Sequence, residues 1–118
     1  MQRIIAAYFN SLRALKRAWG SESAVRQELV LLAIGVPLAM FIAPGAWVRV
    51  ALIGSLLLVL MIELLNTAIE KVCDRLHPGQ DELIGFVKDL GSAAVLMSLL
   101  LAGCVWLTAL WQWADAWI

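Results

Sequence analysis

The chain has 118 residues with a formal net charge of zero; 63% of them are hydrophobic and only 15% are charged. A soluble domain this small cannot bury so much apolar surface, so the composition excludes an ordinary globular protein and favours one membrane domain over residues 1–118. The six tryptophans lie mostly near the ends of apolar segments, which fits membrane anchoring better than base stacking. No nucleic acid partner is therefore expected.

The first predicted element is a basic amphipathic helix over residues 2–19. Apolar side chains recur there at helical spacing, and the basic residues lie mostly on the opposite side. Such a helix lies in the membrane surface with its cations near lipid headgroups. It can serve as a plain anchor or can also grip a lipid or a nucleotide, and both uses stay open. Ser21 or Ser23, in the break that follows, is a candidate cap for the next helix.

Three apolar segments follow the surface helix, and each is close to the length of about 20 residues that a membrane-spanning helix needs. They cover about 28–45, 47–69 and 90–113. Pro37 interrupts the first segment and Pro44-Gly45 ends it, so its helix can begin earlier, near Ser23. The predicted fold class is all-α, with three transmembrane helices and an N-terminal surface helix.

The basic residues are distributed unevenly between the two sides that these spans define. Eight of the nine lie before the first span or between the second and the third, and only Arg49 lies in the other connection. By the positive-inside rule, the N-terminus and the 70–90 loop are expected in the cytoplasm and the C-terminus on the outer side.

Polar residues repeat along one stripe at the end of the second span. They are Glu63, Asn66, Glu70 and Asp74. Their spacings of three, four and four residues place them on one face of a helix. Counted from Arg49 at 1.5 Å per residue, Glu63 lies about 21 Å and Glu70 about 31 Å along the helix, and the second value matches the thickness of the hydrocarbon core.

The depths of these carboxylates suggest different roles. Glu63 should be partly desolvated and within reach of a lipid headgroup, which suits a general base. It can equally be a carboxylate paired with a cation of another helix, and spacing alone does not decide. Glu70 is accessible from water and, with Glu22 or Glu28, can hold Mg²⁺ through carboxylate and phosphate oxygens. Each of these acids can also be merely solvated.

A second polar group stands where the third span begins. Lys88 can act as a point charge on phosphate. Asp89 can hold a metal, bond a ribose hydroxyl or cap the helix, and capping is the commonest of these uses. The small residues 91–94 that follow allow another helix to approach closely. The chain has no P-loop, no protein-kinase motif, no zinc pattern and no Ser/His/Asp set.

Three segments together resemble a known family. They are Glu63-Leu64-Leu65-Asn66-Thr67-Ala68-Ile69-Glu70, Lys88-Asp89-Leu90-Gly91-Ser92-Ala93-Ala94-Val95-Leu96 and Glu22-Ser23-Ala24-Val25-Arg26-Gln27-Glu28. They are similar to the signature blocks of the bacterial integral-membrane diacylglycerol kinases, whose wider family includes undecaprenol kinases. The resemblance implies a homotrimer in the bacterial inner membrane, with active sites shared between subunits at the cytoplasmic interface. It also implies transfer of the γ-phosphate of MgATP to the hydroxyl of diacylglycerol, giving phosphatidic acid.

The resemblance also implies roles for individual residues. Glu63 matches the general base, while Glu22 and Glu70 match the acids that coordinate Mg²⁺. The implied ATP contacts are Arg3, Asn10, Glu22, Asn66, Glu70, Lys88 and Asp89. The implied lipid-binding positions are Glu28, Glu63 and Ser92. The chain departs from the family at Asn10, where other members have an aromatic residue, and in the 79–86 loop, which replaces a more polar, basic one.

Two other functions compete with this interpretation. An undecaprenol kinase would perform the same chemistry on a longer acceptor, although the Gly-Ser-Ala-Ala and Arg-Gln-Glu runs favour diacylglycerol. A non-enzymatic carrier or channel would use the intramembrane carboxylates for ion movement. That function does not explain Lys88 and Asp89 at the mouth of the third span.

Overall fold

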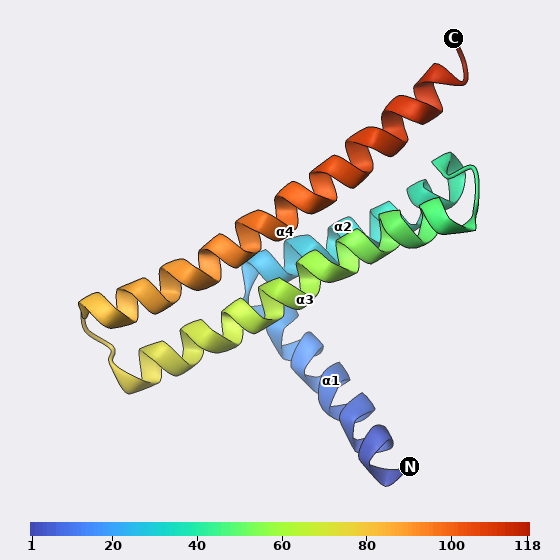
Figure 1. The fold of residues 1–118 in the computed structure, drawn as a ribbon. Helices are drawn as coiled ribbons and strands as arrows, with labels where there is room; N and C mark the ends of the chain where they lie inside the picture. The colour runs from blue at the N-terminus through green and yellow to red at the C-terminus, as the bar shows by residue number, and fades with distance from the viewer.

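The computed structural model describes all 118 residues and consists of four α-helices joined by short connections (Figure 1). The helices are α1 (Gln2–Ser21), α2 (Ser23–Ile42), α3 (Ala46–Leu76) and α4 (Glu82–Asp115). The last three are each long and apolar enough to cross a membrane, and the chain contains no strand. The prediction of an all-α protein with three membrane spans is therefore confirmed.

The helix α1 leaves the start of α2 and projects away from the other three helices (Figure 1). None of its residues is buried, and apolar side chains such as Ile4 and Tyr8 remain exposed. One hydrogen bond ties it to α2 across the break, because Arg26 Nη1 donates to the carbonyl oxygen of Trp19 at 2.9 Å. The placement of α1 on a membrane surface stays a prediction.

The break between α1 and α2 is shorter than the sequence suggested. Glu22 alone has an extended backbone there, and it is the N-cap residue of α2 without any side-chain cap bond. The prediction that Ser21 or Ser23 caps α2 is wrong. Because α1 stays helical through Ser21, the Ser21 hydroxyl donates within its own helix, to the carbonyl oxygen of Arg17 at 3.2 Å.

The helices α3 and α4 extend beyond the predicted spans and form a long hairpin. Their 31 and 34 residues correspond to about 46 and 51 Å, against about 30 Å for a hydrocarbon core. Asp81 caps α4, since its Oδ2 accepts a hydrogen bond from the backbone N–H of Ile84 at 3.0 Å. The interpretation of Asp89 as a helix cap is therefore wrong, because α4 begins at Glu82 and Asp89 lies well inside it.

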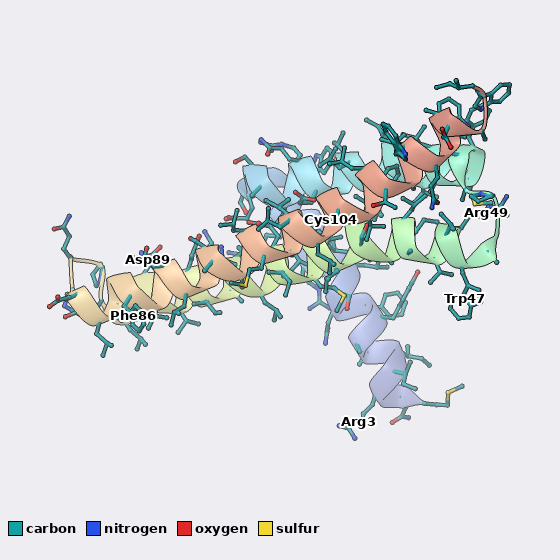
Figure 2. The ribbon with its side chains drawn as sticks, turned by 45° about the horizontal axis from the view of Figure 1, so that its top comes forward. Arg3, Trp47, Arg49, Phe86, Asp89 and Cys104 are labelled. Atoms are coloured by element: carbon teal, nitrogen blue, oxygen red, sulfur yellow. The ribbon has the colours of Figure 1, made fainter.

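The helix α3 is central and packs against both α2 and α4. A small apolar core fills the end of the bundle where Trp47 and Arg49 lie, opposite the α3–α4 connection near Phe86 (Figure 2). Only 16 of the 118 residues are buried. Most large apolar side chains thus face outward, as expected for helices whose solvent is lipid.

A hydrogen bond also joins α4 to α3 within this apolar region. Trp106 Nε1 donates to the carbonyl oxygen of Leu52 at 3.2 Å, and Leu52 is fully buried.

Replacing Trp106 with Phe removes the donor and should cost about 1 kcal/mol of stability. SDS-induced unfolding in mixed micelles measures this loss. The matched control Trp111→Phe changes a side chain that is 75% exposed and should stay within about 0.5 kcal/mol of the parent; equal losses in both variants would contradict the role of this bond.

Candidate active site

The polar stripe of α3 faces the neighbouring helices of its own chain. Glu63 is only 9% exposed and Asn66 only 7% exposed. The predicted desolvation of Glu63 is therefore confirmed. The charge of Glu63 acts on the carboxylate of Glu28, on α2, and the charge of Glu70, two turns further along α3, acts on Glu63. Three acids from two helices thus share one region of the bundle.

No cation of the chain pairs with Glu63. The two ion pairs join Lys71 to Glu22 and Lys88 to Asp74, and both lie further along α3. Within the chain, Glu63 therefore forms no interhelical ion pair. A buried carboxylate without a cation is suited to accept a proton.

Asn66 connects the buried part of the stripe to Glu70 and to α4. Its Nδ2 donates to Glu70 Oε1 at 3.1 Å, while its Oδ1 is buried without a partner. Gly91 of α4 lies directly against this side chain, so closely that a Cβ at position 91 would collide with Asn66 Oδ1. The predicted close approach of a helix to the small residues is confirmed for Gly91, which is the only buried member of the run 91–94.

Lys88 lies beside Asp74, the last residue of the polar stripe. Its Nζ donates to Asp74 Oδ1 at 2.5 Å, and both side chains are accessible to solvent. The charge of Glu70 also acts on Lys88. Lys88 is thus held by an ion pair with Asp74, an acid for which the sequence predicted no individual role.

A polar groove of about 660 Å³ runs along the other side of the stripe, between α1, the start of α2 and α3. Its lining consists of Asn10, Arg13, Ala14, Arg17, Ala18, Ser21, Glu22, Thr67 and Lys71. Three cations and one carboxylate therefore face one space. Arg13 and Arg17 belong to the basic face of the N-terminal helix, for which a grip on a lipid or a nucleotide was left open, and their four-residue spacing places both on one helix face. Lys71 had been given no role from the sequence.

The carboxylate of Glu22 is held by its neighbours in this groove. Lys71 Nζ lies 3.1 Å from Glu22 Oε2. The hydrogen bond from Lys71 lowers the pKa of Glu22 below the ordinary value of a glutamate. Glu22 is therefore ionised at neutral pH and already engaged with a cation.

Three predicted site residues do not reach this region within one chain. Arg3 lies at the free end of α1, far from Asp89 on α4 (Figure 2). Asp89 and Ser92 are both exposed on α4, away from the face that Gly91 presents to α3. The single chain thus gathers the acids, Asn66 and Lys88, but leaves part of the predicted nucleotide and lipid contacts apart.

The carboxylates of this region suit a metal ion that binds together with substrate phosphates rather than a metal ion that the chain binds alone. No three His, Cys, Asp or Glu side chains come close enough to hold a metal ion. Glu22 and Glu70 provide carboxylates, and each already has one hydrogen-bonding partner. Mg²⁺ is commonly bound by one or two protein carboxylates together with substrate phosphates, so this donor set fits it.

The model of the prokaryotic diacylglycerol kinase family matches residues 9–110. The chain belongs to this family. The diacylglycerol kinase of Escherichia coli (strain K12) is 44% identical over 110 residues, which are 93% of this chain and 90% of that protein. The diacylglycerol kinase of Haemophilus influenzae is 43% identical over 81% of both chains, and that of Pseudomonas aeruginosa is 34% identical over 93% of this chain and 89% of its own. Membership in the family, together with three spanning helices, makes the chain a multi-pass inner-membrane protein.

The ion pair of Glu22 has a testable pH dependence. Because the pKa of Glu22 is lowered in the folded protein, the pair stabilises the fold above the ordinary glutamate value of about 4.3, and this contribution is lost as the pH falls through the lowered value. Replacing Lys71 with Met should raise the pKa of Glu22 toward that ordinary value. NMR titration of the Glu22 carboxyl carbon measures the change.

The control for this titration is Lys16→Met, which removes an exposed lysine of α1 that forms no ion pair. It should leave the pKa of Glu22 unchanged. An unchanged titration in Lys71→Met would contradict the assignment of Lys71 as the main cause of the shift.

Proposed function

We propose that the protein transfers the γ-phosphate of MgATP to the free hydroxyl of 1,2-diacylglycerol, which gives phosphatidic acid and ADP. Membership in the family makes the chain a lipid kinase. The observation that carries the proposed mechanism is the buried, cation-free carboxylate of Glu63 on the same helix face as the accessible carboxylate of Glu70. A lipid alcohol and a water-soluble phosphate donor can therefore meet along one stripe.

On the lipid side, Glu63 acts as the general base. Its carboxylate accepts the proton of the lipid hydroxyl while the hydroxyl oxygen attacks the γ-phosphorus and the bond to the β-phosphate oxygen of ATP breaks. Glu70 lies seven positions after Glu63, which is about 10 Å along a helix. The acceptor thus remains in the bilayer while the nucleotide approaches from water. Glu28 lies close enough to orient the same lipid headgroup.

On the nucleotide side, the phosphates lie against the polar groove and against the end of the stripe that contains Glu70 and Asp74. Arg13, Arg17 and Lys71 line the groove, and guanidinium and ammonium groups bind phosphate well. At the other flank, Lys88 pairs with Asp74 and is also acted on by the charge of Glu70. Glu22 and Glu70 would hold the Mg²⁺ that accompanies ATP, and this ion supplies neutralisation of the charge on the phosphates.

The active form is a homotrimer in which neighbouring subunits complete each site. Arg3, Asp89 and Ser92 are polar residues that do not contact the stripe of their own chain. If the exposed face of α4 in one subunit packs against a neighbouring subunit, Asp89 and Ser92 of the first subunit would lie next to the polar stripe of the second. The basic residues near the α3–α4 connection orient this end, with the N-terminus, toward the cytoplasm and the C-terminus toward the periplasm.

The first experiment measures phosphate transfer from ATP by the purified protein in mixed micelles. Diacylglycerol should be phosphorylated faster than undecaprenol, as the names of the relatives also suggest. Glu63→Gln keeps the shape of the side chain but removes the base, and it should lower the rate about 10²- to 10⁴-fold while the assembly persists.

The control for this experiment is Glu82→Gln, an exposed acid in the first turn of α4, which should keep the parent rate. Full turnover in Glu63→Gln would rule out the base. A faster reaction with undecaprenol would make that lipid the substrate, and the absence of ATP consumption with either lipid would favour the carrier.

A metal titration tests the second acid. Glu70→Ala removes one of two proposed ligands, so half-maximal activity should require about 10- to 100-fold more Mg²⁺. Glu82→Ala serves as the matched control because its side chain lies outside the stripe. If both variants have the Mg²⁺ dependence of the parent, Glu70 does not bind the metal.

A further inference from the structure

We propose that Gly91 is a positioning residue of the active site, which acts on Glu70 through the side chain of Asn66. The space that its missing Cβ leaves on α4 is filled by the Asn66 amide, and the amide in turn holds the Glu70 carboxylate. The inference rests on the proposed function for the role of Glu70, but the geometry on which it depends is internal to one chain.

The three residues form one continuous set of contacts. A Cβ built at Gly91 would overlap Asn66 Oδ1 and would lie only 3.2 Å from Asn66 Cγ. The opposite end of the same amide donates to Glu70 Oε1 at 3.1 Å. Since Asn66 is only 7% exposed, its amide has no free space to turn into when it is pushed from the α4 side. Displacing it therefore breaks or bends the bond to Glu70.

This close approach of α4 to α3 is found at Gly91, beside the polar stripe, and not along the whole of α4. Gly103, twelve residues later in the same helix, has nothing within 4 Å of a built Cβ. A methyl group is therefore accommodated at Gly103 but not at Gly91, although both glycines lie inside one helix. The pair provides a matched comparison, because the intrinsic effect of Gly→Ala on a helix is the same at both positions.

The chemical effect of the contact is on the direction of the Glu70 carboxylate. Asn66 occupies one lone pair of Oε1 and leaves the remaining lone pairs for another ligand. Hydrogen bonds of this kind fix the orientation of metal-binding carboxylates, and their loss typically costs about 10- to 100-fold in metal affinity or activity. A purely structural glycine would instead change stability or helix spacing without changing this orientation.

The test compares Gly91→Ala with Gly103→Ala in the full-length protein in micelles, by two measurements. The first is the side-chain amide NMR signal of Asn66 in the nucleotide-free protein, which should shift in Gly91→Ala and not in Gly103→Ala. The second is Mn²⁺ affinity, measured by electron paramagnetic resonance with a non-hydrolysable ATP analogue. It should fall about 10- to 100-fold in Gly91→Ala only.

A double variant separates positioning from helix spacing. In an Asn66→Ala background the collision is absent, so adding Gly91→Ala should cause no further loss of Mn²⁺ affinity. If Gly91→Ala alone fails to fold, the double variant should restore the fold, because the colliding amide has gone. A further loss in the double variant, or no recovery of the fold, would overturn the proposal.

The remaining outcomes are also decisive. An unmoved Asn66 signal in Gly91→Ala, or a shifted signal with parental Mn²⁺ affinity, would overturn the positioning role. A parent protein that phosphorylates no lipid would overturn the proposed function instead. In that case the Asn66 signal of the nucleotide-free protein still reports whether Gly91 places the amide.

Discussion

The structure depends on the cost of placing carboxylates in a membrane helix. A charged side chain at the centre of a spanning helix costs about 3 kcal/mol on insertion scales. This cost fixes the rotation of α3 about its axis, because Glu63 and Asn66 must face protein rather than lipid. They are accordingly among the few buried residues of the chain. The opposite face of α3 then presents apolar side chains such as Leu65 and Val72 outward.

The arrangement around the stripe is not one that stability alone would favour. Glu63 has a like-charge interaction with Glu28 and another with Glu70, while both lysines that form ion pairs pair with other acids. Replacing buried polar groups with well-packed apolar ones is often neutral or stabilising. Such local conflicts between polarity and packing are typical of functional sites. The stripe therefore supports a function that stability does not require.

Much of the fold was predictable because hydropathy and helical periodicity are local properties of the sequence. The three spans and the shared face of Glu63 and Asn66 follow directly from spacing. The contacts between helices did not follow, since Gly91 meets Asn66 only at one register of α4 on α3. Helix ends were also less predictable: Asp81, not Asp89, caps α4, because this helix begins at Glu82, before the apolar segment that was predicted to start at about residue 90. The groove between α1 and α3 was not predicted, because it depends on the angle at which α1 leaves α2.

The angle between α1 and α2 links α1 to the polar groove on the nucleotide side of the proposed site. No residue of α1 is buried, and the polar ties near its end are the Arg26–Trp19 hydrogen bond and the Glu22–Lys71 ion pair that follows it. Under the proposed function, phosphates that draw Lys71 away from Glu22 loosen the second tie and free a carboxylate for the metal. Coupling between binding and position is reciprocal, so any membrane contact that fixes α1 also changes the affinity of the groove for phosphate. Under the proposed function, α1 therefore contributes to the active site through the groove residues Arg13 and Arg17.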